Sequence, residues 1–231
     1  MDINNKGQIV GSGSSDSSVQ RAILWQNGTT IDLLPDVGSS FATGINDRGQ
    51  VVGGTLAGAY VWGKGVVTNL SAIGNIPGQN ATAGAAYDIN NKGQVVGRSS
   101  TPAGQHATLW DHGQVVDLGT LTAGAVDSTA LAINERSQVV GYSFEVGAQR
   151  AFIWQDGLMV NLNDLISPSA GFSLVYPDDI NDRGQIIVEA DNGHSYLLTP
   201  VPEPGTYALM LLGLMSVAIV VHRRKPRRPS R

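Results

Sequence analysis

At residues 88–97 the chain reads Asp-Ile-Asn-Asn-Lys-Gly-Gln-Val-Val-Gly, and related copies of this motif begin near residues 2, 44, 132 and 179. Successive copies are 42 to 47 residues apart. A motif that returns at such a period is typical of folds in which one structural unit is repeated and stacked on itself. The central isoleucines of the later copies are predicted core residues; these are Ile45, Ile89, Ile133 and Ile180.

Each copy of the motif also predicts a β-hairpin. The segment Asn-x-x-Gly fits a type I turn whose last residue is left-handed, which gives a three-residue hairpin loop with a bulge. Glycine removes the steric cost of that conformation, and it stands at Gly7, Gly49, Gly93 and Gly184. The fourth copy has Ser137 at this position, so we expect its turn to be the most strained.

A second motif, an apolar tetrad that ends in tryptophan, lies between copies of the first, at residues 22–25, 59–62, 107–110 and 151–154. Both faces of the tetrad are largely apolar, which indicates a strand packed between two neighbours. We predict that Trp25, Trp62, Trp110 and Trp154 are core residues; exposed tryptophans that stack on sugar rings are the alternative. The Trp-x-x-Gly segment that follows predicts the same kind of turn as Asn-x-x-Gly.

About four short strands in some 44 residues are the content of one β-propeller blade. We therefore predict an all-β, propeller-like array of about five four-stranded repeats; an open β-solenoid or a sandwich of meanders is the alternative. The first repeat has almost no opening strand and the fifth no closing strand, so we expect an array that is incomplete at its N-terminus or that closes imperfectly. The repeats lie near residues 1–40, 41–84, 85–128, 129–175 and 176–199.

The composition excludes several classes of chemistry. There is no cysteine among the 231 residues, which excludes disulfides, thiolate metal sites and cysteine nucleophiles. The net charge of −4 combines an acidic body, with nine basic and eighteen acidic side chains in residues 1–200, and six basic residues in 222–231. An acidic body argues against nucleic acid as a partner, because binding to phosphates needs a basic surface.

The C-terminal residues differ sharply from the body. Residues 200–206 are a proline-rich linker, residues 207–221 carry no charge, and residues 222–231 form a basic tail. We predict that 207–221 is a transmembrane helix, extended by snorkelling basic side chains, with the tail in the cytoplasm and the body outside. The basic stop-transfer residues are Arg223, Arg224, Lys225, Arg227 and Arg228.

The order of these features resembles the PEP-CTERM sorting signal of Gram-negative bacteria, a signature also known as an ice-binding-protein C-terminal domain. The sorting motif consists of Val201, Pro202, Glu203 and Pro204. The resemblance implies an inner-membrane-anchored precursor from which an exosortase removes the helix and tail, so that the body reaches the cell surface or the extracellular polysaccharide. Met1 leads directly into a repeat with no N-terminal signal peptide, and we expect that the start of the protein is missing.

The body resembles the HAF-repeat family of extracellular proteins, over about residues 1–199. The copies of Ile-Asn-x-x-Gly-Gln-Val-Val-Gly and the Ala-x-Leu-Trp tetrads carry this resemblance. The family has no established activity, so the resemblance implies an extracellular protein and no particular reaction.

No group of residues in the sequence predicts catalysis, a metal or a cofactor. The segment Asp88–Gly93 looks like half of a calcium loop, but its glycine comes one residue late and no closing glutamate follows. The asparagine already has a structural role, because its side chain can bond to the turn backbone. We predict no catalytic residues and no enzyme activity.

These features together predict a non-enzymatic, exported surface or matrix protein that binds or associates with extracellular polysaccharide. Its expected partners are the exosortase, the inner membrane before cleavage and the extracellular polysaccharide. One alternative is a secreted, propeller-type carbohydrate-active enzyme with acidic residues at the central mouth. Another is ice binding, which needs a flat array of regularly spaced threonines; those of this chain do not recur in register.

Overall fold

The protein is described by a computed structural model that covers residues 1–14, 19–73 and 84–201. The chain divides into two compact units, Met1–Thr199 and Pro200–Arg231. All of the strands described below belong to the first unit.

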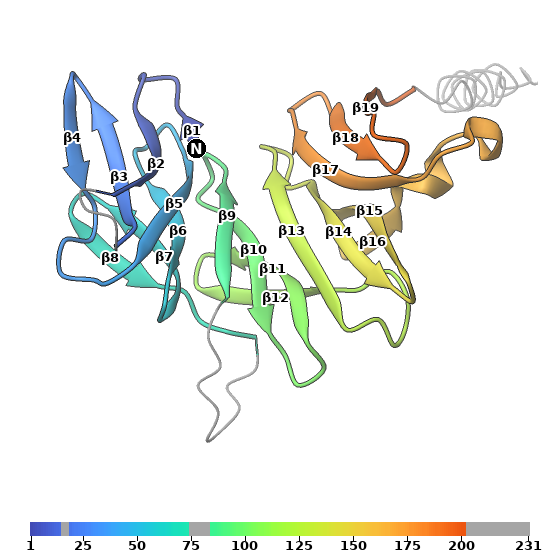
Figure 1. Ribbon diagram of the computed structural model, residues 1–231, viewed down its shortest axis with the longest axis horizontal. Coiled ribbons are helices and arrows are strands. Elements are labelled where there is room, and N and C mark those ends of the chain that lie inside the picture. The colour runs from blue at the N-terminus through green and yellow to red at the C-terminus, as the bar shows by residue number, and fades with distance from the viewer. Residues whose placement is uncertain (15–18, 74–83, 202–231) are drawn as a thin grey trace, which may run out of the picture. The chain divides into compact units, whose positions relative to one another are not determined.

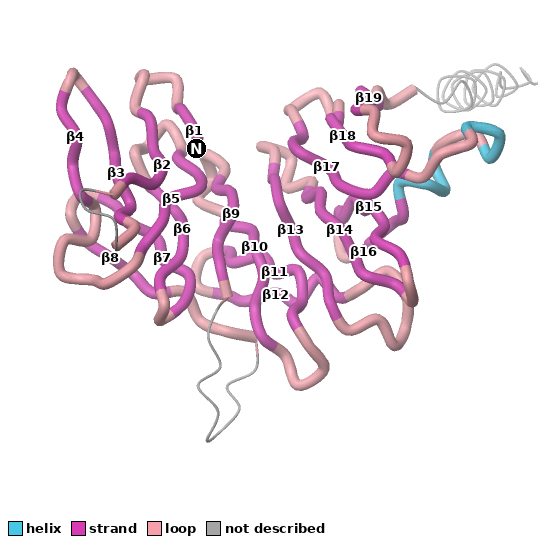
Figure 2. Tube along the Cα trace, viewed as in Figure 1, coloured by secondary structure: helices cyan, strands magenta, loops and turns pink. Residues whose placement is uncertain are grey.

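Within these described residues the first unit forms five antiparallel sheets, which follow one another in chain order (Figures 1 and 2). Sheet 1 contains β1 (Asp2–Ile3), β2 (Ile9–Gly13), β3 (Arg21–Gln26) and β4 (Thr29–Asp32). Sheet 2 contains β5 (Ser40–Ile45), β6 (Val51–Thr55), β7 (Gly58–Gly63) and β8 (Val66–Asn69). Sheet 3 contains β9 (Ala85–Ile89), β10 (Val95–Ser100), β11 (Gln105–Asp111) and β12 (Gln114–Gly119).

Sheets 4 and 5 are separated by two short 3-10 helices, η1 (Leu162–Leu165) and η2 (Pro168–Ala170). Sheet 4 contains β13 (Asp127–Ile133), β14 (Val139–Glu145), β15 (Ala148–Gln155) and β16 (Leu158–Asn161). Sheet 5 contains β17 (Leu174–Ile180), β18 (Ile186–Ala190) and β19 (Ser195–Leu198). The predicted all-β, propeller-like array of repeated sheets is therefore confirmed, with three strands rather than four in the described part of sheet 5.

The Asn-x-x-Gly turns have the predicted geometry. In the third copy the N–H of Gly93 donates to the carbonyl of Asn90 over 3.0 Å, and Gly93 has a φ of +87°. Ser137 adopts the same left-handed conformation, with a φ of +63°, although it is not glycine. A side chain is unfavourable in this region of backbone space, which is the strain that the sequence predicts for the fourth turn.

The Trp-x-x-Gly turns differ from the prediction. Strands β3 and β4 are joined by only two residues, Asn27 and Gly28, which have φ angles of +50° and +75°. Two successive left-handed residues make a type I′ turn, whose twist matches that of the flanking strands. The prediction of a three-residue loop with a bulge is therefore wrong for this second motif.

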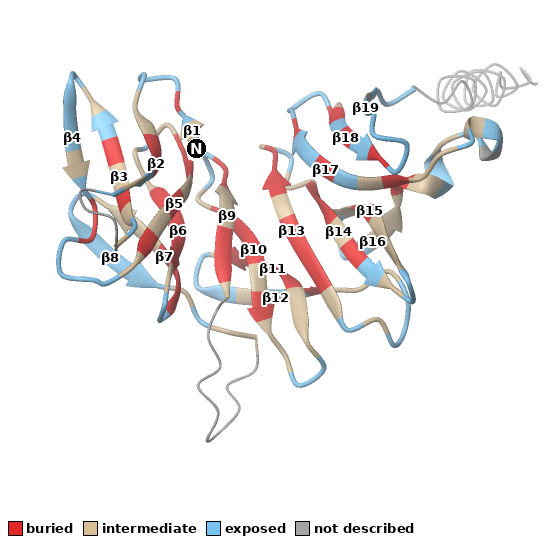
Figure 3. Ribbon diagram, in the orientation of Figure 1, coloured by how far each residue is buried: buried red, intermediate tan, exposed pale blue. Residues whose placement is uncertain are grey.

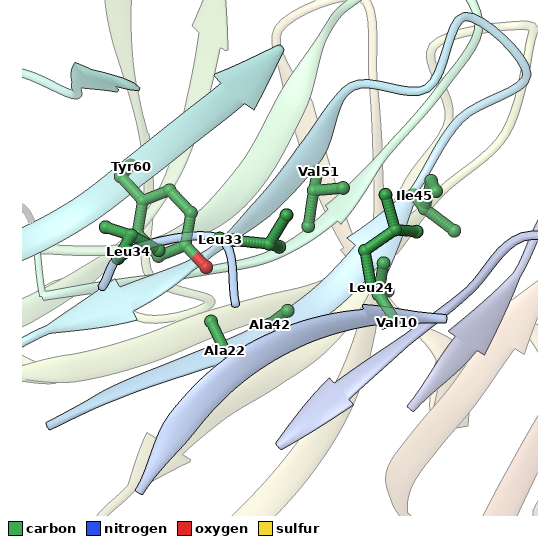
Figure 4. Close-up of a cluster of buried hydrophobic side chains, with 9 residues drawn as sticks. All are labelled: Val10, Ala22, Leu24, Leu33, Leu34, Ala42, Ile45, Val51 and Tyr60. Atoms are coloured by element: carbon green, nitrogen blue, oxygen red, sulfur yellow. The ribbon is translucent and has the colours of Figure 1, made fainter. Parts of the chain in front are cut away.

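The hydrophobic core lies in layers between successive sheets. One cluster joins sheets 1 and 2 (Figure 4) and consists of Val10, Ala22, Leu24, Leu33, Leu34, Ala42, Ile45, Val51 and Tyr60. Similar clusters join sheet 2 to sheet 3, sheet 3 to sheet 4, and sheet 4 to sheet 5. The inner strands of the middle sheets are therefore buried on both faces, whereas the outer strands β4 and β8 are largely exposed (Figure 3).

The predicted core residues occupy this layered core to different degrees. The isoleucines Ile45, Ile89, Ile133 and Ile180 are all buried. Trp110 is 4% exposed, Trp62 and Trp154 are half-buried against the core clusters, and Trp25 is 43% exposed.

The C-terminal predictions fall mostly outside the part of the chain that the structure describes. Pro202, Glu203, Pro204, the proposed helix 207–221 and the basic residues 223–228 all lie in the undescribed range 202–231, and Val201 is exposed. Across the described ranges there is no helix with both the length and the apolar character needed to cross a bilayer.

Candidate functional site

The Ile-Asn-x segments of the five sheets surround one cavity of about 310 Å³, which we call the axial cavity. Its lining comes from residues 3–5, 45–47, 89–91, 133–135 and 180–182. Each sheet therefore contributes the same three positions, from the end of its first strand and the start of the following turn. The lining is apolar at the isoleucines and polar or acidic elsewhere, with no lysine or arginine.

The asparagine of each segment bonds to its own turn, and in sheets 1 to 4 it also bonds to the next sheet. In sheet 3 the Oδ1 of Asn90 accepts from the backbone N–H groups of Lys92 and Gln94, each over 3.0 Å. Its Nδ2 donates to Oε1 of Gln94 over 2.8 Å and to the carbonyl of Asn134 in sheet 4 over 3.1 Å. The predicted bond between the asparagine and its turn is thus confirmed, and the bond to the next sheet is an additional one.

The same step recurs from sheet to sheet and forms what we call the asparagine ladder. In each step the side-chain Nδ2 donates to the backbone carbonyl of the next asparagine. The steps are Asn4 to Asn46 (3.0 Å), Asn46 to Asn90 (3.1 Å), Asn90 to Asn134 (3.1 Å) and Asn134 to Asn181 (3.0 Å).

A second series of hydrogen bonds follows the residue after each asparagine. Its backbone N–H donates to the side chain of the corresponding residue in the next sheet. The pairs are Asn5 to Asp47 (2.9 Å), Asp47 to Asn91 (2.8 Å), Asn91 to Glu135 (2.6 Å) and Glu135 to Asp182 (2.8 Å). The side-chain bond from Asn5, followed by the bond from its backbone, lowers the pKa of Asp47. Most polar groups around the axial cavity are therefore bonded to one another.

Three aspartates, Asp2, Asp88 and Asp179, precede the isoleucine in sheets 1, 3 and 5. Asp88 accepts from the backbone N–H of Ile89 over 2.7 Å and from that of Ile133 in sheet 4 over 2.8 Å. Burial raises the pKa of Asp88 to about 6; the two backbone bonds oppose this rise, and the charges of Asp2 and Asp179 add to it.

These aspartates bear on the enzyme alternative, which requires acidic groups that converge at the centre of the array. The charges of Asp2 and Asp179 do reach Asp88, since both contribute to its raised pKa. However, both oxygens of Asp88 hold backbone N–H groups, and Asp2 likewise accepts from Ile3 and from Ile45 in sheet 2. Asp2 and Asp88 thus connect neighbouring sheets, whereas Asp179 accepts from the backbone N–H of Ile180 in its own sheet.

We expect Asp88→Asn to change the pH dependence of stability. Because the pKa of Asp88 is raised from 3.8 to about 6 in the folded chain, the favourable contribution of its protonated form is present below pH 4 and is lost as the pH rises through 6. Relative to the wild type, the variant should therefore gain about 2–3 kcal/mol of unfolding free energy between pH 4 and pH 7. Urea denaturation at several pH values measures this change.

The control for Asp88→Asn is Asp36→Asn, which removes an exposed carboxylate from the loop after β4. An equal pH profile for the two variants would show that Asp88 has no special role.

A second candidate site is a group of aromatic rings on sheets 4 and 5, Tyr142, Phe144 and Tyr176, which we call the aromatic patch. The rings of Tyr142 and Tyr176 stack with centroids 5.4 Å apart, and those of Tyr142 and Phe144 meet edge to face, also at 5.4 Å. Phe144 is 45% and Tyr176 36% exposed. Exposed apolar rings next to polar groups are typical of binding surfaces.

Carboxylates border the aromatic patch. Glu189 of β18 lies directly across from Tyr176 of β17 in sheet 5. Burial raises the pKa of Tyr176, and Tyr142 and Asp178 add to this effect. Burial also raises the pKa of Asp178, and the nearby charge of Glu189 raises it further. The aromatic patch therefore combines exposed ring surface with two hydrogen-bond acceptors.

The sequence motifs do not reveal the aromatic patch. Tyr142 follows the Val-Val-Gly of its unit, at the position of Gly54 in sheet 2 and Arg98 in sheet 3. The one sign of the aromatic patch in the sequence is that Tyr142 differs from the residues at this position in the other units. As for metals, no group of three or more histidine, aspartate or glutamate side chains within the described ranges could hold an ion.

Comparison with protein families identifies residues 200–225 as a PEP-CTERM protein-sorting motif. This motif is the recognition signal for exosortase processing, and it marks the chain as an exported protein that is sorted by exosortase. The predicted sorting signal is therefore confirmed at the level of the motif. No curated protein sequence matches the chain significantly.

The chain is distantly similar to solved structures, among them two from Pyrococcus. The β-propeller domain of the Trilobed protease from Pyrococcus furiosus is 14% identical with a TM-score of 0.43; the match covers 70% of this chain and 52% of that one. An acylaminoacyl peptidase from Pyrococcus horikoshii is 17% identical with a TM-score of 0.45, over 85% of this chain and 32% of that one. The chain thus spans about half and about a third of these two proteins.

Proposed function

We propose that the protein is a non-enzymatic surface or matrix protein that associates with extracellular polysaccharide after exosortase has removed its C-terminal segment. In this proposal residues 207–221 are the helix that anchors the precursor in the inner membrane, and the basic tail from Arg223 lies in the cytoplasm. The repeats are HAF repeats, in keeping with the motifs of the body. The sorting motif at residues 200–225 supports the route of export.

The aromatic patch is the observation that carries the polysaccharide-binding part of the proposal. The C–H groups of a sugar ring pack well on the exposed faces of Phe144 and Tyr176, because aromatic rings offer a broad, rigid apolar surface. The carboxylates of Asp178 and Glu189 can accept hydrogen bonds from sugar hydroxyl groups at the edge of the patch. Neutral sugars need this combination of stacking and acceptors, and they need no basic surface.

The bonding of the acidic groups supports a non-enzymatic role. Asp2 and Asp88 hold backbone N–H groups of two sheets each, and Asp47 accepts from the side chain and backbone of Asn5. A general acid or base must be able to reach a substrate proton, and these carboxylates are already engaged within the chain.

Gel retardation tests the proposal. The purified full chain is expected to migrate more slowly in native gels that contain the exopolysaccharide of the producing bacterium. We expect Tyr176→Ala to weaken this binding about tenfold, because it removes a stacking surface, and Tyr176→Phe to retain it. The matched control is Trp25→Ala, which removes an equally exposed ring from sheet 1.

Two outcomes would contradict the proposal. Retention of binding by Tyr176→Ala together with its loss in Trp25→Ala would place the sugar on the tryptophan motif instead. A mature protein in the matrix whose mass still includes residues 209–231 would refute removal of the C-terminal segment.

A further inference from the structure

In four of the five sheets, the glutamine that follows the Asn-x-x-Gly turn bonds across to the third strand of its sheet. Its Nε2 donates to the side chain of the residue at or just after the end of that strand. The pairs are Gln8 to Gln26 (2.6 Å), Gln94 to Asp111 (3.0 Å), Gln138 to Gln155 (2.9 Å) and Gln185 to Thr199 (3.4 Å). A side chain therefore occupies the space beside the glutamine in sheets 1, 3, 4 and 5.

Sheet 2 lacks this bond, because the residue at the end of its third strand is Gly63, which has no side chain. A pocket of about 470 Å³ lies there, which we call the donor pocket; it is lined by Arg48, Gln50, Gly63 and Lys64. Oε1 of Gln50 accepts from Nδ2 of Asn46 over 2.8 Å, but no described residue accepts from its Nε2. A Cβ atom at Gly63 would meet Cγ of Gln50 at an ordinary contact distance of 3.7 Å. The glycine thus leaves both an empty space and a free donor.

Two cationic side chains, Arg48 and Lys64, line the donor pocket, and both are exposed. Nη2 of Arg48 donates to the carbonyl of Asn91 in sheet 3, which ties the guanidinium to the next sheet and leaves its other N–H groups available. Neither Arg48 nor Lys64 forms an ion pair with a carboxylate of the described residues. The lining therefore offers three donor side chains and no carboxylate.

Lys64 is unusual for its position in the turn between β7 and β8, where it has a φ of +52°. The same position holds Asn27 in sheet 1, His112 in sheet 3 and Asp156 in sheet 4. Asparagine, aspartate and histidine are the non-glycine residues that most often adopt left-handed backbone, and lysine is not among them. Backbone strain of this kind is concentrated at functional positions.

We propose that the donor pocket binds the carboxylate group of an acidic sugar unit. The planar guanidinium of Arg48 matches the two oxygens of a carboxylate, and the ammonium of Lys64 adds a second positive charge. Nε2 of Gln50 donates to a hydroxyl or ring oxygen of the same sugar. The volume of the donor pocket is in the range of sites for small organic groups.

The source of this sugar rests on the proposed function, which makes extracellular polysaccharide the ligand of the protein. The donor pocket belongs to sheet 2 and the aromatic patch to sheets 4 and 5, so the two sites share no residue. A polysaccharide that contains both neutral and acidic units satisfies both of them.

Calorimetric titration of the full chain in mild detergent with oligogalacturonate, a chain of uronic acid units, tests the proposal. We expect binding that weakens with added salt, and no binding after the carboxyl groups of the oligosaccharide are reduced to alcohols. Lys64→Asn should weaken the binding about tenfold with no loss of stability, because asparagine suits the turn. Gly63→Gln keeps both charges but fills the donor pocket with the residue found in sheets 1 and 4, and should also weaken binding about tenfold.

Arg136→Gln is the matched control for Arg48→Gln. Each of the two arginines donates through Nη2 to a backbone carbonyl of the next sheet, but sheet 4 has Asp156 at the position of Lys64. Arg48→Gln should therefore weaken binding about tenfold, and Arg136→Gln by less than about twofold.

Four results would overturn the proposal. These are the absence of oligogalacturonate binding, equal losses in the two arginine variants, binding that survives Gly63→Gln, and tighter binding of a DNA oligonucleotide of the same charge. Tyr176→Ala separates this proposal from the proposed function, because it leaves the donor pocket intact and should bind oligogalacturonate as the wild type does. A chain that is retarded by the exopolysaccharide but does not bind oligogalacturonate would refute the donor pocket alone.

Discussion

Asn90→Ala is expected to lower the free energy of unfolding by about 3–5 kcal/mol. The substitution removes two acceptor bonds to the backbone of its own turn and two donor bonds, one of them to Asn134 of sheet 4. Asn90 is 4% exposed, so the groups that it leaves unpaired are shielded from water, and each carries a desolvation cost. Chemical denaturation followed by circular dichroism measures the loss.

The chain supplies a matched control for this prediction. Asn181 makes the same bonds within its own turn, but it is exposed and donates to no further asparagine in the described sheets. Asn181→Ala should therefore cost about 1–2 kcal/mol. Equal losses for the two variants would show that the bond between sheets contributes nothing.

Gly141→Ala is the second substitution with a large expected effect, a loss of at least about 3 kcal/mol. A Cβ atom at residue 141 would overlap the carbonyl oxygen of Thr129 and would lie 2.7 Å from Cζ of Phe152. Thr129 precedes the register shift of β13 that brings the backbone of that strand close to β14. Backbone cannot move aside as a flexible side chain does, so β13 and β14 must separate.

Gly11→Ala tests the same position in sheet 1. There the nearest atom to a new Cβ is Cγ of Met1, at an ordinary contact distance of 3.5 Å. The free energy of unfolding, measured by urea denaturation, should therefore fall sharply for Gly141→Ala and change by less than about 1 kcal/mol for Gly11→Ala. A mild effect at both positions would mean that the strands separate easily.

The repeat and its turns are predictable from the sequence because they are encoded locally. Asn90 and Gly93 stand within one turn, and the bonds that shape this turn involve only its own residues. The type I′ geometry after the tryptophans is wrongly predicted, although Asn27-Gly28 and Asp156-Gly157 are characteristic of that turn. In both motifs the glycine is left-handed, but only in the second is the preceding residue left-handed too.

Contacts between units could not be predicted, because they depend on how one sheet packs on the next. The bond from Asn90 to Asn134 spans 44 residues. The motif itself is the same whether or not a neighbouring sheet accepts this bond. The same limit applies to Trp25 and Trp110, which share a motif and differ tenfold in exposure. Tyr142 and Tyr176 meet only because sheets 4 and 5 pack together, and no repeat connects their positions.

The asparagine ladder also has a consequence for how the array unfolds. Each unit bonds only to its immediate neighbours, so the stability of the array is a sum of nearest-neighbour terms, as in other linear repeat proteins. The middle unit is held on both sides, whereas sheet 5 is held by sheet 4 alone among the described sheets. Backbone amides in β18 and β19 should therefore exchange with solvent sooner than those in β10. The exosortase recognition motif therefore follows in sequence a unit that opens more readily than the middle one.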